Sequence, residues 1–412
     1  MCDCLCAVRA DGTLFAKNSD RPPGEAQIIE AIAARPTGGS LRTQYRVLPD
    51  VGATALFGAR PTWLWGFEHG VNSHRVAIGN EQLWTIDTPV VQPDSFTGMD
   101  LVRLGLERSE RAEQALEIII ALLEEFGQGG VGEQGTDGDE GKAYFSSFLI
   151  ADPTEAWVLE TSGRAWAARR VTAADHGVAL SNRISLTTDW TRASTDVERT
   201  GDFDQWRRAS SPTAHADKRL AVTTPAARAA SGEGSDPRQV AAVLRHHGTG
   251  VWGAPGHPGD EVGTLPSAVI DRLGTGVSVC MHLTGVQATT SSMITWLPRD
   301  PGQALRSWVA PGNPCVSVFV PTFGVDGLAP ELADEATWDR FRRLRDRVEQ
   351  ARATEGDGGS AALTRIRSVL GPIETELWDE ADRAAATGPA ERAGWARALW
   401  PRVEAGLVAL GV

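Results

Sequence analysis

The chain begins Met1-Cys2-Asp3-Cys4-Leu5-Cys6-Ala7-Val8-Arg9-Ala10-Asp11-Gly12-Thr13-Leu14-Phe15-Ala16-Lys17-Asn18-Ser19-Asp20-Arg21. Two runs rich in strand-forming residues flank Ala10-Asp11-Gly12, and an Asp-Gly pair between such runs is a strong signal for a β-hairpin. We therefore expect the chain to begin inside a sheet. The succession of charged, apolar and small residues typical of a signal peptide does not precede the first strand, so we expect this N-terminus to have a function of its own.

Cys2 becomes the N-terminal residue if Met1 is removed. It then carries a thiol and a free α-amine that titrates near pH 8, so it can serve as its own nucleophile and base. Cys4 and Cys6 alternate with Cys2 and would share one face of a strand. A thiolate metal site is the alternative for these cysteines, but an obvious fourth ligand is lacking nearby. We expect Cys4 and Cys6 to be small buried hydrophobes.

The charge and the cysteine content exclude several classes of function. The 412-residue chain carries 53 acidic and 40 basic side chains, a net charge of −13. Nucleic acid is not an expected partner, because binding phosphates requires a basic surface. No apolar run approaches the roughly 20 residues needed to span a bilayer, so no membrane association is predicted. Five cysteines do not make a disulfide framework in a chain of this length, which favours the cytoplasm.

The remaining strands and helices follow from periodicity and turn residues. Strands are predicted at 27–34, 45–48, 53–57, 76–80, 179–186, 277–283, 293–297 and 316–320, with a three-stranded meander over 148–169. A long helix is predicted from an N-cap at Ser109 to a stop at Gly127, and another from a cap at Asp236 to Gly248. The chain is expected to be helical from 338, with two helices between 363 and 412. Residues 127–141 are expected to form a mobile lid or a surface loop.

Several blocks occur in a distinctive order. Cys2-Asp3-Cys4-Leu5-Cys6-Ala7, Phe15-Ala16-Lys17-Asn18-Ser19-Asp20-Arg21-Pro22 and Glu25-Ala26-Gln27 come first. They are followed by Arg60-Pro61-Thr62-Trp63-Leu64-Trp65-Gly66, Gly79-Asn80-Glu81, Gly98-Met99-Asp100-Leu101-Val102-Arg103-Leu104-Gly105-Leu106-Glu107-Arg108 and Trp157-Val158-Leu159-Glu160-Thr161. In this order they resemble the secernins and their relatives, a cysteine dipeptidase family of N-terminal-nucleophile (Ntn) hydrolases.

The resemblance implies a fold and a division of the chain. We expect an α+β protein, the four-layer αββα sandwich of Ntn hydrolases, with a helical C-terminal extension. The catalytic domain would span 1–325 and the extension 326–412. Periodicity alone predicts only a mixed α and β protein.

The resemblance also implies a reaction and the residues that perform it. Cys2 would attack an amide carbonyl of a dipeptide or small peptide, and water would hydrolyse the acyl-enzyme. In relatives that hydrolyse bile salts and penicillin V, an arginine and an aspartate follow the hairpin. The matching positions are Lys17 and Asp20. Asn80 and Asn182 are similar to the positions that supply oxyanion donors, and no cofactor is implied.

Two further residues are candidates for substrate binding. Trp65 either lines a substrate pocket or packs between layers, and Arg183 could meet a substrate carboxylate. His282 would lie on the same strand face as Cys280, so these two form an alternative Cys–His pair to Cys2. A homo-oligomer is possible, with the C-terminal helices as its surface or as a partner surface.

The sequence departs from the family at Arg75, where the relatives carry glycine, and this departure puts dipeptide specificity in doubt. Two other functions therefore stay open. One is an amidase or acyltransferase acting on a nonpeptide N-acyl substrate. The other is a noncatalytic interaction protein resembling some secernins.

Overall fold

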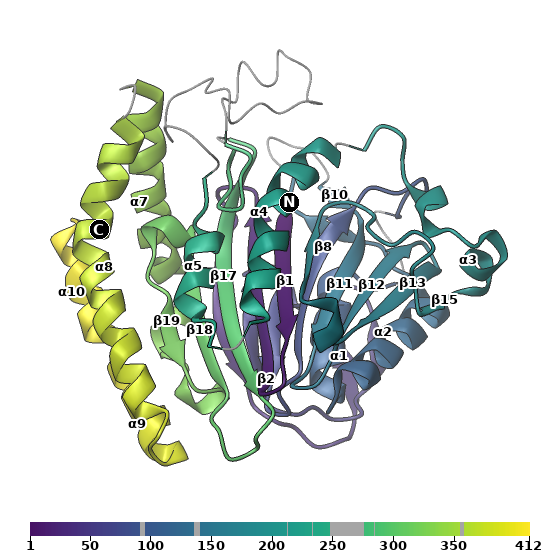
Figure 1. Ribbon diagram of the computed structural model, residues 1–412, viewed down its shortest axis with the longest axis horizontal. Helices are drawn as coiled ribbons and strands as arrows, with labels where there is room; N and C mark the ends of the chain where they lie inside the picture. The colour runs from purple at the N-terminus through teal and green to yellow at the C-terminus, as the bar shows by residue number, and fades with distance from the viewer. Residues whose placement is uncertain are drawn as a thin grey trace.

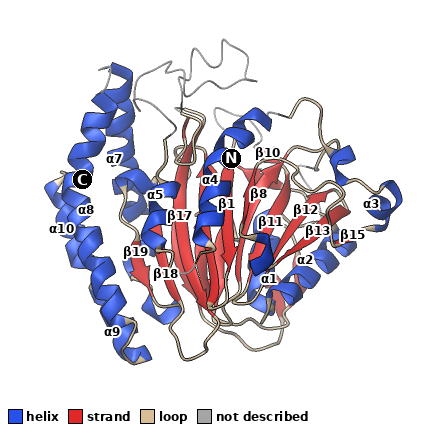
Figure 2. Cartoon of the chain, viewed as in Figure 1, coloured by secondary structure: helices blue, strands red, loops and turns tan. Residues whose placement is uncertain are grey.

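A computed structural model describes residues 1–90, 95–135, 141–211, 213–232, 234–247, 276–283, 285–354 and 358–412. The strands form two large antiparallel sheets, one of seven and one of eight strands, with helices on their outer faces (Figures 1 and 2). Two small two-stranded sheets pair β4 (Ser40–Arg42) with β5 (Val47–Pro49) and β9 (Val131–Glu133) with β10 (Lys142–Ala143).

The predicted opening hairpin is confirmed, and it forms the centre of the seven-stranded sheet. β1 (Cys2–Val8) pairs with β2 (Gly12–Arg21) so that Cys2 lies opposite Ser19. The order across this sheet is β14 (Val178–Ser181), β1, β2, β17 (Gln287–Pro298), β18 (Arg306–Pro311) and β19 (Val320–Thr322), with β16 (His282–Leu283) paired to β17. The first residues of the chain are therefore flanked by strands on both sides.

The eight-stranded sheet contains the predicted meander, which is confirmed as β11 (Phe145–Ala151), β12 (Ala156–Ser162) and β13 (Ala165–Val171). The full order is β15 (Arg192–Ala193), β13, β12, β11, β8 (Ala77–Leu83), β7 (His69–Asn72), β6 (Leu56–Pro61) and β3 (Gln27–Ile32). β8 lies in the middle of this sheet, where Gly79 faces Cys4 and Lys17 of the other sheet and Asn80 follows it.

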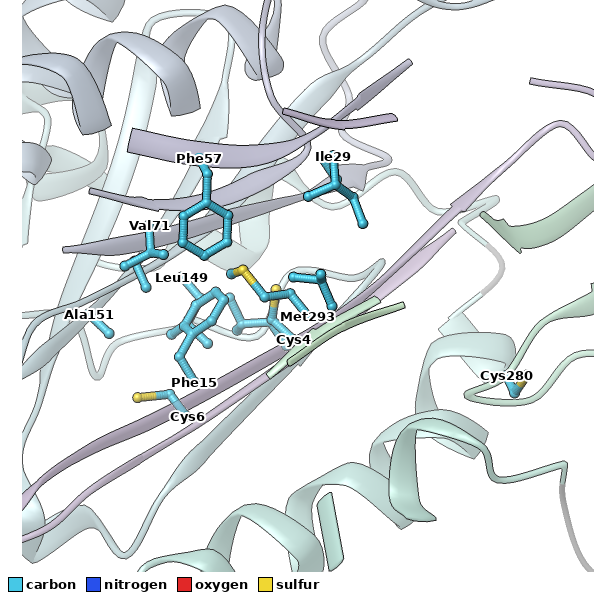
Figure 3. Packing of buried hydrophobic residues seen from close by; sticks show 14 of the residues in the cluster. Cys4, Cys6, Phe15, Ile29, Phe57, Val71, Leu149, Ala151, Cys280 and Met293 are labelled. Atoms are coloured by element: carbon cyan, nitrogen blue, oxygen red, sulfur yellow. The ribbon is translucent and has the colours of Figure 1, made fainter. Parts of the chain in front are cut away.

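The two sheets stack face to face over an apolar core. Figure 3 shows Cys4, Cys6 and Phe15 of the seven-stranded sheet pointing toward Phe57 and Leu149 of the eight-stranded sheet. All five side chains are buried. Cys4 and Cys6 are therefore the small buried hydrophobes that their alternation predicts.

Helices cover the outer face of each sheet. α1 (Gly98–Arg108) and α2 (Ala112–Phe126) share a core with the outward side chains of the eight-stranded sheet, such as Phe148 and Leu159. α4 (Thr213–Ala230) and α5 (Pro237–Leu244) cover Leu5 and Ile294 of the other sheet. The layers run helix, sheet, sheet, helix, and the predicted αββα sandwich with a helical C-terminus is confirmed.

The helix predicted to end at Gly127 is confirmed as α2, but its predicted N-cap at Ser109 is wrong. Two helices occupy this region, and Ser109 is the C-cap residue of the first. That helix, α1, begins with a capping box in which the Thr97 side chain accepts from the Asp100 N–H and the Asp100 carboxylate accepts from the Thr97 N–H. α2 begins after Arg111 without a side-chain cap and ends at Gly127, as predicted.

Residues 188–264 contain more helix than the single one predicted. The predicted helix is α5, and Asp236 caps it by accepting from the Arg238 N–H; its expected end at Gly248 lies outside the described residues. α3 (Thr195–Thr200) and α4 precede it. The buried positions of α4 are His215, Ala216, Arg219, Thr223, Ala227 and Ala230. They follow helical spacing, but their only hydrophobic members are three alanines, so the pattern was not visible in the sequence.

The late strands are shorter or longer than predicted. Of 277–283 only β16 is strand, 293–297 is the end of the longer β17, and 316–320 contains the end of a 3₁₀ turn and the start of β19. The 3₁₀ turns are η1 (Ala173–Asp175), η2 (Phe203–Trp206), η4 (Pro314–Val316), η5 (Val325–Gly327) and η6 (Pro330–Ala333).

The C-terminal helices are α7 (Glu335–Thr354), α8 (Gly358–Ala384), α9 (Pro389–Ala398) and α10 (Trp400–Ala409). The prediction of two helices after residue 363 is wrong, because Gly388-Pro389 and Trp400-Pro401 start new helices. The helices lie beside β18 and β19 in Figure 1. Among the described residues, no helix combines the length and apolar character needed to cross a membrane.

Candidate active site

Cys2 lies at the start of β1, and hydrogen bonds fix both its main chain and its thiol. Its backbone N–H donates to Asn182 Oδ1 at 2.7 Å. The backbone N–H of Asp20, across the hairpin, donates to Cys2 Sγ at 3.4 Å. The side chain is buried, and burial raises the pKa of the Cys2 thiol while the Lys17 ammonium opposes the rise. A neutral thiol of this kind needs a proton acceptor before it can act as a nucleophile.

Arg219 of α4 joins the residues around Cys2. Its Nη1 donates to the Cys2 carbonyl oxygen at 2.9 Å and to Asp3 Oδ2 at 2.8 Å, and its Nη2 donates to Asn182 Oδ1 at 2.8 Å. Asp20 Oδ2 lies 3.9 Å from Nη1. The guanidinium is fully buried and compensates two buried carboxylates. Arg219 was not predicted as a site residue, because α4 was not predicted.

Asp20 faces this guanidinium from the end of β2. Its Oδ1 accepts a hydrogen bond from Thr289 Oγ1 at 2.7 Å. Burial raises the pKa of Asp20 to about 6, although the N-terminal ammonium and Arg219 both act to lower it. Desolvation thus outweighs the two positive charges.

This shift predicts a pH dependence of stability. The pKa of Asp20 in the folded protein, about 6, lies above the unfolded value of about 3.9. The contribution of Asp20 to the free energy of unfolding is therefore fully present below pH ~4 and is lost as the pH rises through ~6. The loss amounts to about 3 kcal/mol. We expect the free energy of unfolding, measured with urea at pH 4.5 and 7.5, to fall less with pH in Asp20→Asn than in the wild type.

Asp326→Asn is the control for this measurement, because Asp326 is exposed. The free energy of unfolding of Asp326→Asn should change between pH ~4.5 and ~7.5 by the same amount as that of the wild type. An equal change for Asp20→Asn and the wild type would contradict the raised pKa of Asp20. Samples should have the same intact mass, since the N-terminal ammonium also acts on Asp20.

Lys17 connects the two sheets beneath the thiol. It is fully buried on β2, and its Nζ donates to the Asn80 carbonyl oxygen on β8 at 2.5 Å. Burial alone would lower the pKa of Lys17, but Cys2 and nearby acidic groups that include Glu81 reverse the effect and raise it. Gly79 provides the room, because a Cβ there would lie 2.6 Å from Lys17 Cδ.

Both predicted oxyanion residues lie in this cluster. The Asn182 amide nitrogen donates to the Gln82 carbonyl at 2.9 Å, which leaves its second hydrogen for another acceptor. With its nitrogen facing Glu68, the Asn80 amide donates to the Glu68 carbonyl at 3.0 Å and to Oε2 at 3.3 Å. Glu68 also acts on the pKa of Cys2. The oxyanion role of both asparagines stays a prediction.

The N-terminal ammonium of Met1 lies in a polar corner beside Cys2. It donates to Gln287 Oε1, and at 3.4 Å to the Asp20 carbonyl oxygen. Gln287 Nε2 in turn donates to Glu133 Oε2 at 3.0 Å. Although burial raises the pKa of Glu133, Arg21 and the Met1 ammonium outweigh it and lower that pKa. The buried Glu133 carboxylate therefore attracts a positive group that occupies this corner.

Glu133 belongs to the segment expected to be a lid or a surface loop. Residues 136–140 lie outside the described part, but β9 is ordered against the site. The Gly132 carbonyl accepts from Arg21 Nη2 at 2.6 Å, and Arg21 Nη1 donates to Glu68 Oε1 and to the Tyr144 hydroxyl, each at 3.0 Å. Sequence reasoning missed Glu68, Glu133 and Tyr144 because each comes from a segment with no motif of its own.

The two predicted substrate-binding residues have other partners. The Arg103 guanidinium lies 4.0 Å from the centre of the Trp65 ring, and Trp65 packs with the α1 and α2 core. Arg183 Nη1 forms an ion pair with Asp217 of α4. Neither side chain has a described contact with Cys2, and their roles in binding remain predictions.

Arg75, where the resemblance implied a glycine, has a positive φ of 68°. Glycine adopts this conformation at no steric cost, whereas an arginine is strained. The Arg75 guanidinium donates to the carbonyls of Pro298, Asp300, Pro301 and Gln303 at 2.8–3.0 Å. These bonds hold the β7–β8 turn against the β17–β18 turn and offset the strain.

One family of known proteins matches the middle of the chain. Residues 64–191 match the model of peptidase family C69. The match confirms, over this segment, the predicted resemblance to the secernin and dipeptidase family, and it includes Asn80 and Asn182. It supports cysteine-dependent hydrolysis of an amide bond as the class of reaction.

Three solved structures are similar to this chain at low sequence identity. Penicillin V acylase from Agrobacterium tumefaciens is 10% identical (76% of this chain, 83% of that chain, TM-score 0.42). A mutant of conjugated bile acid hydrolase from Clostridium perfringens is 11% identical (74% and 88%, TM-score 0.42). The Caenorhabditis elegans ortholog of N-acylethanolamine-hydrolyzing acid amidase is 10% identical (60% and 86%, TM-score 0.33).

Proposed function

We propose that this protein cleaves the amide bond of a dipeptide or small peptide through an acyl-enzyme on Cys2, after Met1 has been removed. One observation carries the proposal: the Cys2 nitrogen is bonded to Asn182 Oδ1 at 2.7 Å, beside a buried thiol. Loss of Met1 turns this peptide nitrogen into a primary amine at the same place. The amine then supplies the proton acceptor that the neutral thiol lacks.

The reaction proceeds in two halves. The Cys2 amine takes the thiol proton, the sulfur bonds to the substrate carbonyl carbon, and the carbonyl oxygen becomes negative. When the carbon–nitrogen bond breaks, the amine returns the proton to the leaving amine. Water then attacks the thioester, the amine again moves the proton, and the thiol is released with the carboxylic acid product.

The negative oxygen of the tetrahedral intermediate requires fixed donors, each worth about 3 kcal/mol. The second hydrogen of the Asn182 amide nitrogen is the better placed, since the Asn80 nitrogen already has two acceptors on Glu68. Arg219 holds Asn182 and the Cys2 carbonyl in place. Asp20 positions the thiol through its backbone N–H.

The corner that holds the Met1 ammonium favours a substrate with a free α-amine. Gln287 and Glu133 would still be there after Met1 is lost, and the buried Glu133 carboxylate attracts a positive group. The N-terminal ammonium of a dipeptide provides one, whereas an N-acyl compound does not. This corner favours a dipeptidase over an amidase of nonpeptide N-acyl substrates.

We expect Glu133→Gln to raise KM for a free-amine dipeptide about 10-fold, the equivalent of about 1.4 kcal/mol, because it removes the charge and keeps the shape. KM for the N-acetylated dipeptide should not change. Steady-state kinetics on both substrates measure this, with the exposed Glu110→Gln as the matched control. An equal effect on both substrates would argue against recognition of the ammonium.

Intact mass spectrometry tests the proposal itself. The purified protein should lack Met1, and a dipeptide chloromethyl ketone should add one label that Cys2→Ala loses and Cys6→Ala keeps. Retained Met1, or a label that persists in Cys2→Ala, would overturn the mechanism. Labelling at Cys2 combined with turnover of N-acyl compounds alone would keep the nucleophile and exclude the dipeptidase.

A further inference from the structure

Four side chains outside the Cys2 site converge on one buried point. They are His247 just after α5, Cys280 and His282 around the start of β16, and Cys315 in η4. One ligand atom from each lies within 4.8 Å of all the others. From this convergence we propose that the four residues bind one zinc ion in a closed structural site. The proposal is independent of the function proposed for Cys2.

The spacing of the donor atoms suits a tetrahedral ion. His282 Nε2 lies 3.5 Å from Cys280 Sγ and 3.3 Å from Cys315 Sγ. Zinc–nitrogen and zinc–sulfur bonds of ~2.0 and ~2.3 Å at tetrahedral angles give an edge of ~3.6 Å. The His247 and His282 ring centres are 5.0 Å apart. Small shifts of these side chains therefore suffice to place the ion.

Glu349 orients the central histidine. Its Oε1 lies 3.1 Å from His282 Nδ1, on the opposite side of the ring from the two sulfurs. A hydrogen on Nδ1 donates to this carboxylate, which leaves the lone pair of Nε2 directed at the sulfurs. A histidine that binds a metal commonly donates its other ring N–H to a carboxylate in this way.

A Cys280–His282 catalytic pair, the alternative considered from the sequence, explains the geometry less well. The pair is brought together, but a second thiol approaches the same ring nitrogen. The exposed fractions of Cys280, His282 and Cys315 are 0%, 0% and 2%, so a substrate would not reach them. Structural zinc sites are closed in this manner, whereas catalytic sites keep an open position.

Charge also favours a divalent cation. Two thiolates with two neutral imidazoles carry two negative charges, which one Zn²⁺ neutralises, and thiolate with imidazole suits zinc. Both cysteines are free thiols. Figure 3 shows Cys280 apart from Cys4 and Cys6, so these ligands do not include the opening cysteines.

The ion would fix the segment that supports the Cys2 site. The Asn313 amide donates to the Met281 carbonyl at 2.9 Å, and the Met281 N–H donates to Thr289 Oγ1, which bonds Asp20. Met1 packs against the cluster that Met281 forms with Val277 and Leu283. Zinc is thus expected to stabilise the fold by joining the end of α5, β16 and η4, because the free energy of metal binding adds to the free energy of folding.

The first test measures zinc by inductively coupled plasma mass spectrometry on untagged protein from zinc-supplemented medium. We expect about one zinc per chain, lost in Cys280→Ser and Cys315→Ser and kept in Cys6→Ser. Cobalt-exchanged wild type should show the visible absorption of a tetrahedral thiolate site. A protein without stoichiometric zinc, or zinc kept in the Cys280→Ser/Cys315→Ser double variant, would overturn the proposal.

A cysteine variant that fails to fold would also lose zinc. A second variant, which changes none of the four ligands, therefore tests the site separately. Glu349→Gln leaves all four ligands in place and should weaken zinc affinity about 10- to 100-fold in competition with a chelator. Glu335→Gln, exposed on the same helix, should bind zinc as the wild type does. Equal affinities for the two variants would contradict the role of Glu349 and, with it, the site.

Discussion

Replacing Cys2 by alanine is expected to lower kcat for amide hydrolysis by about 10⁴-fold or more, because no acyl-enzyme can form without the sulfur. The α-amine remains in the variant, so an amine alone would be left to act on water. The Cys2 nitrogen and carbonyl are bonded to Asn182 and Arg219 through main-chain atoms. These bonds survive the substitution, and we expect substrate affinity to change little.

The measurement is a comparison of kcat and substrate Kd for the wild type, Cys2→Ala and Cys6→Ala. Cys6 is a matched control, since it lies on the same strand and is also buried. Cys6→Ala should keep kcat within a few-fold. A residual kcat in Cys2→Ala near that of the wild type would reject Cys2 as the nucleophile.

Removing Arg219 should have the largest effect on stability. Its guanidinium is fully buried between Asp3 and Asp20 and forms three hydrogen bonds around Cys2 and Asn182. Arg219→Ala would leave two buried carboxylates without their cation, and breaking a buried pair in this way costs about 3–5 kcal/mol. We expect a matching loss in the free energy of unfolding in urea.

Arg228 provides the control, because it lies on the same helix and is exposed. Arg228→Ala should stay within about 0.5 kcal/mol of the wild type. Arg219→Lys separates charge from geometry, since lysine keeps the charge but not the fork that reaches several acceptors. A loss below ~1 kcal/mol in Arg219→Ala would show that the carboxylates find compensation elsewhere.

The parts of the fold that were predictable are those with strong local signals. The Asp11-Gly12 turn, the apolar runs of the meander and the Asp236 cap each act over a few residues. α4 was missed because its buried face consists of an arginine, a histidine, a threonine and three alanines and has no stripe of large apolar residues. Its pattern makes sense only once the charges that Arg219 compensates are known.

The site residues that neighbouring strands bring together were predictable, and those whose partners come from distant segments were not. The hairpin brings Cys2 and Asp20 together by register, and β14 places Asn182 beside β1. Trp65 and Arg183 were chosen for their side-chain types, and their neighbours Arg103 and Asp217 come from distant segments. No spacing rule connects such pairs. The same holds for the four proposed zinc ligands, which come from three separate segments.

The hydrogen bond from Lys17 to the Asn80 carbonyl has a consequence for when the protein becomes active. It joins a strand of one sheet to a strand of the other through the room left by Gly79. A chain that has formed both sheets without stacking them would keep Lys17 and Cys2 together on the paired strands β1 and β2 but would hold both away from Asn80. Such a chain would lack one of the two predicted oxyanion residues, so the proposed site would be complete only after the two sheets have packed.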